Sequence, residues 1–349
     1  MADQDGTGAV FGGLPDVASR ALGGAVLFAS DEFFADVHHL IEPGPTGHDP
    51  AAFGLRGKLY DGWETRRRRE PGADSAIVRL AAPAVLRGVN VDTTHFRGNY
   101  PPAAAVDGAT LLGYPALADV LAAGWLPLTG PARLGGNQAN LMPVTAPDRL
   151  VTHVRLSIQP DGGVARLRAF GEIVPDPRRL GGRVDLAAAL AGGEVTACSN
   201  LFFAAPANVL APGRARVMSD GWETARRRDD GNDWLVVRLA APGVLHHVVI
   251  DTSRFVGNAP GAARLLDAET GAELLPRTRL LPDTEHRFRI RAAHPVRLVR
   301  LDIYPDGGIS RLRLVGEIPA ALREPVAERW LSLLPAELAA TVDRAEFFD

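Results

Sequence analysis

A short segment rich in carboxylate and guanidinium groups occurs twice in the chain. Residues 61–69 read DGWETRRRR, and residues 220–228 read DGWETARRR. Carboxylates such as Asp61 and Glu64 can accept hydrogen bonds from urea-type N–H groups, or can act as general acid and base. Arginine pairs bidentately with a carboxylate. The two segments therefore predict recognition of a small organic acid together with acid–base chemistry. A purely structural interpretation stays open, with Trp63 in a core and Glu64 paired with Arg68 at the surface.

A second motif follows the first at the same separation in both halves. Asp92-Thr93 with Gly98-Asn99 is matched by Asp251-Thr252 with Gly257-Asn258. These side chains are also compatible with simple capping of a turn after a strand. Because the separation is kept, we expect the two motifs to converge at one end of a β-sandwich, where loops often bind ligands.

Histidine and cysteine give little support for a metal or thiol mechanism. None of the nine histidines recurs at an equivalent position in the two halves, and neither HxH nor HExxH occurs. The single cysteine, Cys198, excludes an intramolecular disulfide and a zinc site of several thiolates, and it favours a reducing compartment. We therefore expect no cofactor, although Asp and Glu side chains could still hold a divalent ion.

Both motifs belong to a tandem duplication. Residues 61–101 and 220–260 align without a gap, with about 25 of 41 positions identical. The segments 30–44 and 199–213 also match, and so do 155–173 and 300–318, the last pair at a shorter separation. This shorter separation predicts an insertion in the first copy near residues 116–124.

The repeated blocks are expected to form short antiparallel strands. Apolar residues alternate through 77–80 before Pro83, and a further strand is expected to begin at Val89 after a short turn. PDGG at 160–163 and 305–308 lies between two alternating runs and predicts a tight hairpin. Because helical periodicity is rare, the pattern predicts an all-β sandwich or jelly roll rather than a parallel α/β fold.

The chain divides into five parts on this interpretation. They are an N-terminal tail (1–24), a first repeat (25–175), a linker (176–194), a second repeat (195–319) and a helical C-terminal tail (320–349). Leu186 and Leu190 predict a short helix in the linker that ends at Gly192. Val326, Trp330 and Leu334 predict a C-terminal helix that ends at Pro335.

Composition excludes several classes of protein. A formal net charge of −3 predicts no binding to nucleic acid. No apolar stretch is long enough to span a membrane, and the N-terminus does not read as a signal peptide. These features predict a cytoplasmic protein that does not associate with membranes.

The shared motifs resemble the repeat of the allantoicase family. The resemblance rests on DGWETRRRR, on VRLAAPxVL, on DTxxFxGNxP and on ACSNLFFAAPANVLAPGR at 197–214, and it covers about residues 25–318. It implies two tandem jelly-roll β-sandwich domains of the galactose-binding-like type, related by pseudo-twofold symmetry. It also implies a homo-oligomer, either a trimer or a hexamer. The implied reaction is hydrolysis of allantoate to ureidoglycolate and urea in purine degradation, by a hydrolase acting on non-peptide C–N bonds of linear amidines.

The implied reaction assigns roles to the repeated residues. Cleavage of an aminal-like C–N bond needs an acid for the departing urea and a base for the attacking water. The expected catalytic residues are Asp61, Glu64, Asp92, Asp220, Glu223 and Asp251. The expected substrate-binding residues are Trp63, Arg67, Arg68, Asn99, Trp222, Arg226, Arg227 and Asn258.

The two copies are not identical in their family features. Ser75 stands where the second copy has the aromatic residue Trp234, and Ala225 stands where the first copy has Arg66. A single working site per chain is therefore one expectation. The alternatives are a non-catalytic module that binds sugars or ureides, a structural assembly protein, and a degenerate enzyme that has lost turnover.

Overall fold

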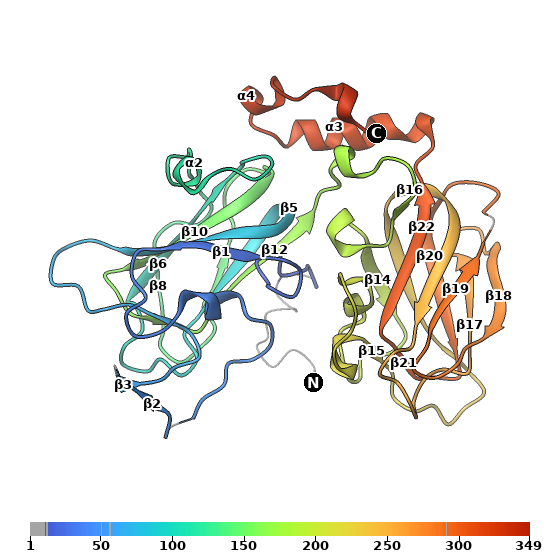
Figure 1. The fold of residues 1–349 in the computed structure, drawn as a ribbon, viewed down its shortest axis with the longest axis horizontal. Helices are drawn as coiled ribbons and strands as arrows, with labels where there is room; N and C mark the ends of the chain where they lie inside the picture. The colour runs from blue at the N-terminus through green and yellow to red at the C-terminus, as the bar shows by residue number, and fades with distance from the viewer. Residues whose placement is uncertain (1–10, 12, 50, 56, 291) are drawn as a thin grey trace. The chain divides into compact units, whose positions relative to one another are not determined.

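The structure is a computed structural model that describes residues 11, 13–49, 51–55, 57–290 and 292–349. The predicted N-terminus without a signal peptide, and residues 1–10 and 12 of the predicted tail, lie outside this set. The chain forms two compact units, each holding one repeat. One unit extends to Val174 and includes Leu333–Ala336, and the other comprises Pro175–Ser332 and Glu337–Asp349. Figure 1 labels the longer strands and the α-helices of the two units.

The first repeat is built almost entirely of β-strands. They are β1 (Ala25–Ala29), β2 (Phe53–Gly54), β3 (Gly57–Lys58), β4 (Trp63–Glu64), β5 (Asp74–Asp92), β6 (Ala103–Ala109), β7 (Leu126–Pro127), β8 (Ala132–Arg133), β9 (Leu141–Pro143), β10 (Val151–Gln159), β11 (Gly163–Val164) and β12 (Arg166–Ile173). Its helices are the 3-10 helix η1 (Val37–Ile41) and the short α2 (Leu117–Leu121).

The second repeat has the same plan. Its strands are β13 (Val184–Asp185), β14 (Glu194–Cys198), β15 (Trp222–Glu223), β16 (Asp233–Asp251), β17 (Ala262–Asp267), β18 (Glu273–Arg279), β19 (Glu285–Arg289), β20 (Val296–Tyr304), β21 (Gly308–Ile309) and β22 (Arg311–Glu317). Its 3-10 helices are η4 (Pro206–Leu210) and η5 (Met218–Asp220). The linker before it holds η2 (Pro177–Arg179) and η3 (Ala189–Ala191), and the C-terminal tail holds η6 (Ala320–Leu322), α3 (Arg323–Ser332), α4 (Ala336–Ala339) and η7 (Arg344–Glu346).

The long strand β5 belongs to both layers of its sandwich. Its first half, up to Arg79, pairs antiparallel with β1 and β10, whereas the half that begins at Ala84 pairs with β12 and β9. The predicted turn between Pro83 and Val89 is wrong, because the backbone stays extended through this stretch. Pro83 lies where the strand changes partners, so its missing N–H removes no bond from either ladder. β16 changes partners in the same way in the second repeat.

The predicted PDGG hairpins are also wrong. β10 and β12 each pair with β5 and not with each other, so residues 160–163 connect the two layers. β11 pairs instead with β4. Gly162 has a φ of 141°, and a Cβ on it would lie 2.7 Å from the backbone nitrogen of Pro101. Glycine is thus required here because the loop packs against the segment that carries Asn99.

Each unit encloses its own hydrophobic core between its two sheets. The core of the first unit includes Val78, Leu156 and Leu167, and that of the second includes Val237 and Leu301. These residues occupy alternate strand positions, so one face of each strand supplies the core. The prediction of two tandem β-sandwich domains is confirmed.

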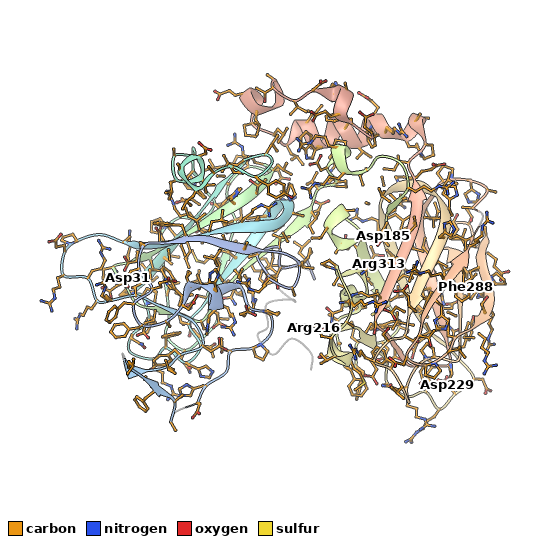
Figure 2. All side chains as sticks on the ribbon, in the orientation of Figure 1. Asp31, Asp185, Arg216, Asp229, Phe288 and Arg313 are labelled. Carbon is orange, nitrogen blue, oxygen red and sulfur yellow. The ribbon has the colours of Figure 1, made fainter. Side chains whose placement is uncertain are left out.

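The linker between the repeats is less helical than predicted. Instead of one helix over 183–193, β13 pairs with β22 and is followed by η3, which ends at Gly192 with a φ of 101°. Asp185 accepts hydrogen bonds from the N–H groups of Ala187 and Leu314, and Arg313 lies beside it in Figure 2. Because the chain is extended at residue 185, Leu186 is buried while Leu190 is 36% exposed. The two leucines therefore do not share a helix face.

The C-terminal tail is helical, as predicted. α3 ends at Ser332, shortly before Pro335, and Trp330 is fully buried within it. The guanidinium of Arg178 lies 4.8 Å from the centroid of the Trp330 ring. Among the described residues, no helix has the length and apolar character needed to cross a membrane.

The predicted insertion in the first repeat lies between β6 and β7. Residues 110–125 include α2, whereas residues 268–272 alone join β17 to β18 in the second repeat. The insertion covers the outer face of one sheet, where the Arg79 guanidinium lies 4.8 Å from the centroid of the Tyr114 ring. Beside Arg79 on this face, His153 is only 1% exposed.

Candidate active site

The two repeated motifs meet at one end of the first sandwich, as predicted. Asn99, in the loop after β5, donates from Nδ2 to Oε1 of Glu64 at 2.6 Å. The second repeat has the same pair, in which Asn258 donates to Glu223 at 2.5 Å. Residues 160–165 join β10, which pairs with the Asp74 end of β5, to β12, which pairs with its Asp92 end, so both ends of β5 lie at the same end of the sandwich. This topology brings together segments that lie far apart in sequence.

Trp63 and Trp222 lie in the cores, which corrects the expectation that they bind substrate. Both are fully buried, so neither offers a ring face to a ligand. Their indole N–H groups donate to backbone carbonyls, of Asp31 at 2.7 Å and of Asn200 at 2.9 Å. Each tryptophan therefore anchors the strand from which the neighbouring glutamate projects.

Arg68 and Arg227, expected to bind substrate, each pair with a buried carboxylate. Arg68 donates to Asp74 at 2.7 Å, and Arg227 donates to Asp233 at 3.0 Å. The side chains of Asp74 and Asp233 are 3% and 0% exposed. An unpaired charge at such a depth is strongly destabilising. These two arginines therefore serve the fold.

Asp92 and Asp251 cap turns, as the structural alternative proposed. Asp92 Oδ1 accepts from the N–H of Thr94 at 2.8 Å and from its hydroxyl at 2.6 Å. Asp251 accepts from the N–H of Ser253 at 2.8 Å and from its hydroxyl. Because both aspartates are buried, they shape the loops that lead to the site asparagines.

Asp61 lies at the centre of a set of hydrogen-bond donors. Its Oδ2 accepts from Arg166 Nη2 and from the N–H of Gly47, each at 2.7 Å. Its Oδ1 lies 3.1 Å from Nδ1 of His39. Partial burial acts to raise the pKa of Asp61, but the bonds from Arg166 and Gly47 hold that pKa below its usual value. Asp61 is therefore ionised at neutral pH.

Glu64 has the opposite environment. Burial raises the pKa of its carboxyl above the usual value, and the hydrogen bond from Asn99 offsets only part of this effect. Two carboxyl groups three residues apart in sequence are thus driven in opposite directions. Acid–base catalysis needs one group that donates a proton and a second group that is ionised. Opposite pKa shifts of two carboxyl groups are the pattern that provides such a pair.

The second repeat lacks part of this arrangement. The side chain of Asp220 accepts from the N–H of Arg216 at 2.8 Å, with Arg216 at the edge of the repeat in Figure 2. Arg311, at the position of Arg166, donates to the main-chain oxygen of Asp220 at 2.7 Å, with no bond to its carboxylate among the described residues. The second repeat keeps the glutamate–asparagine pair without the donor set found around Asp61.

A cavity of about 480 Å³ lies beside the arginine segment of the first repeat. Its lining residues are Ser30, Asp31, Arg66, Arg67, Arg68, Arg69, Glu70 and Asp74. Arg66 is bound to Asp31 at 2.7 Å. Arg67 and Arg69 have no ion-pair partner among the described residues, and neither has Arg226 in the second repeat. Unpaired guanidinium groups beside a cavity suit a carboxylate ligand.

Sequence reasoning missed Arg166 and His39. The signal for Arg166 was present, because an Arg-Leu-Arg triplet follows PDGG in both repeats, at 166–168 and at 311–313. His39 has no such signal, since Asn208 occupies its place in the second repeat. Only the approach of η1 to Asp61 shows that His39 belongs to the site.

Comparison with known proteins identifies the family of the chain. The family model described as the allantoicase repeat matches residues 15–174 and 184–319. The chain belongs to the allantoicase family. It is 54% identical over 312 residues to a probable allantoicase of Nocardia farcinica, covering 87% of this chain and 94% of that one. It is 48% identical over 321 residues to a probable allantoicase of Streptomyces avermitilis, covering 87% and 85%.

The fold agrees as well. The crystal structure of the allantoicase from Saccharomyces cerevisiae matches with a TM-score of 0.75 at 33% identity, covering 86% of this chain and 92% of that one. The allantoicase resemblance inferred from the repeated motifs is thus confirmed. Within the part of this family member that the structure describes, no group of three or more His, Cys, Asp or Glu side chains is placed to hold a metal ion.

Proposed function

We propose that the protein is an allantoicase, which hydrolyses allantoate to ureidoglycolate and urea at the loop end of its first repeat. Family membership supports the activity. The observation that carries the choice of site is the opposite shift of two neighbouring carboxyl groups, with the pKa of Glu64 raised and that of Asp61 lowered.

The chemistry of allantoate matches these two groups. Its central carbon bears a carboxylate and two ureido groups, and one C–N bond must break. The departing nitrogen needs a proton, because an anionic urea is a poor leaving group. We assign this proton transfer to Glu64, because burial raises the pKa of its carboxyl and so makes the protonated form more accessible. Asp61 and the side chains bound to it form the basic side of the site, where water loses a proton.

The substrate carboxylate needs a cationic partner. Arg67 follows Glu64 closely in the chain, lines the cavity at the arginine segment and has no ion-pair partner among the described residues. We assign it the role of binding this carboxylate, with Arg69 nearby. Arg68 lines the same cavity but already pairs with the buried carboxylate of Asp74, so Arg67 is the better candidate. Arg67→Ala is therefore expected to raise KM more than it lowers kcat.

We infer that the reaction needs no cofactor. The protein already supplies donors to both carboxyl groups, from Arg166 and His39 to Asp61 and from Asn99 to Glu64. Turnover after exhaustive treatment with a chelator tests this inference. Loss of turnover that a divalent ion restores would contradict it and would make the same carboxylates candidate ligands.

We also infer a homo-oligomer, a trimer or a hexamer, that works in the cytoplasm. Adjacent exposed aromatic side chains occur in both repeats, Phe33–Phe34 and Phe202–Phe203, and such surface is often covered in an assembly. The lone Cys198 suits a reducing compartment. Light scattering of the purified protein measures its mass, and a monomer would contradict the assembly. Cell fractionation tests the compartment.

Urea release from allantoate by the purified protein tests the proposed function directly. Release of equimolar ureidoglycolate is expected, and no release would refute it. Glu64→Gln is expected to lower kcat about 10²- to 10⁴-fold. Glu223→Gln makes the same change in the second repeat, and its turnover is expected to stay within about twofold of wild type. Equal losses in the two variants would place a working site in each repeat.

A further inference from the structure

We propose that His39 is the catalytic base of the first repeat, oriented by Asp61 and, through it, by Arg166. This inference rests on the proposed function and extends it. His39 takes the proton from the attacking water through its Nε2 atom. Asp61 and Arg166 act as positioning residues.

The local fold presents His39 to the site. It lies on η1, whose first turn is capped by Asp36, which accepts from the N–H of His38 at 2.8 Å. The following residues, Leu40 and Ile41, are fully buried and fix η1 against the sandwich. The side chain of His39 is 42% exposed, so its ring is accessible from solvent beside Asp61.

The hydrogen bond to Asp61 leaves one ring nitrogen available. The ionised carboxylate of Asp61 accepts from Nδ1 of His39 at 3.1 Å. This bond fixes the tautomer with its hydrogen on Nδ1, so the lone pair is on Nε2. Nε2 has no hydrogen-bond partner among the described residues. An imidazole held in this way is arranged to accept a proton.

Asp61 is less suited to the same task. Both of its oxygens are engaged, by His39 on one side and by Arg166 and the N–H of Gly47 on the other. These donors lower the pKa of Asp61, which makes it a weaker base. The imidazole of His39, in contrast, keeps Nε2 without a hydrogen-bond partner among the described residues, and imidazole is a common general base. The network therefore favours His39 as the base and Asp61 as its support.

The second repeat has an asparagine at the position equivalent to His39. Asn208 occupies the place of His39 and donates to the main-chain oxygens of Ser219 at 3.1 Å and Gly221 at 3.2 Å. An amide cannot exchange a proton in this way. The second repeat thus keeps the Glu223–Asn258 pair and lacks the base. One working site per chain follows from this difference.

The proposed step balances in atoms and charge. The oxygen of water bonds to the central carbon of allantoate as one O–H proton passes to Nε2 of His39. The C–N bond breaks, its electron pair stays on the ureido nitrogen, and that nitrogen takes the proton of Glu64. The products are ureidoglycolate and urea. The proton on His39 then returns to the carboxylate of Glu64 through solvent, which restores both groups.

A reciprocal exchange of residues between the repeats tests the proposal. His39→Asn places the second repeat's residue in the first, and kcat is expected to fall at least about 100-fold while KM stays within about threefold. Asn208→His is the matched control, and its kcat is expected to stay within about twofold of wild type. If His39→Asn keeps more than a third of wild-type kcat, His39 is not the base. An absence of urea release by the wild-type protein would instead refute the proposed function.

Chemical rescue separates a catalytic role from a structural one. In His39→Ala, added imidazole is expected to restore part of the lost kcat in a concentration-dependent way, because it can occupy the vacated space and accept the proton. The thermal midpoint of His39→Ala, measured in parallel, reports on folding. Loss of activity without rescue in a variant that melts like wild type would overturn the proposal. The activity loss of His39→Ala could instead accompany a lowered thermal midpoint. If imidazole then fails to rescue His39→Asn as well, the proposal is also overturned.

Discussion

Burial of His153 makes the stability of the first repeat depend on pH. His153 is 1% exposed on the sheet face covered by the insertion, and it lies in register with Arg79 of β5. Burial, with a smaller contribution from Arg79, lowers the pKa of His153 from 6.5 to about 4. The ring is therefore neutral in the folded state at neutral pH.

The sign and size of the effect follow from this shift. An unfolded chain protonates His153 near pH 6.5, whereas the folded chain does so only near pH 4. The free energy of unfolding is thus unaffected by His153 above pH 6.5, and it decreases as the pH falls from 6.5 toward 4. One pKa unit corresponds to about 1.4 kcal/mol, so the full loss is about 3 kcal/mol, and about 2 kcal/mol is lost by pH 5.

Native-state hydrogen exchange measures this loss within one unit, which suits a protein whose two units need not unfold together. His153→Leu is the comparison variant, because Leu298 occupies the equivalent place in the second repeat. Between pH 7.5 and pH 5, the opening free energy of β10 amides is expected to fall about 2 kcal/mol further in wild type than in His153→Leu. An equal fall in both proteins would refute the reasoning. The amides of the second repeat serve as an internal control.

Three other outcomes are expected. Arg68→Ala leaves the buried carboxylate of Asp74 without its cationic partner, and a loss of about 3–5 kcal/mol is expected in chemical unfolding. Gly162→Ala places a Cβ 2.7 Å from Pro101 N and 2.8 Å from Asn99 O, so both the thermal midpoint and kcat are expected to fall. Because the pKa of Glu64 is raised, kcat/KM is expected to decrease as pH rises through that value, and a profile that is flat there would count against Glu64 as the acid.

The duplication made much of the fold predictable. Alternating residues such as those at 77–80 indicated strands, and the insertion near 116–124 followed from the change in alignment. The pairing of the strands was harder to predict from sequence, because alternation is a local property whereas pairing is set by the whole sandwich. For this reason the PDGG loop was taken for a hairpin although β10 and β12 both pair with β5.

The site was only partly predictable for a related reason. Repeated residues occupy equivalent positions in the two repeats. Repetition does not show whether such a side chain is buried in the core or exposed at the site. Trp63 and Arg68 recur because they support the loop, whereas Glu64 recurs at the site itself. His39 differs between the repeats, so a search for repeated residues passes over it. Its role depends on a contact with Asp61 that only the folded chain contains.

The long strand β5 has a consequence for how the first repeat comes apart. Because one strand is hydrogen-bonded into both sheets, neither sheet can lose its alignment without disturbing the other. A slip of one residue would turn the apolar face of β5 outward in both layers at once. Partial unfolding that releases a single sheet is therefore disfavoured, and each sandwich is expected to open as one cooperative unit.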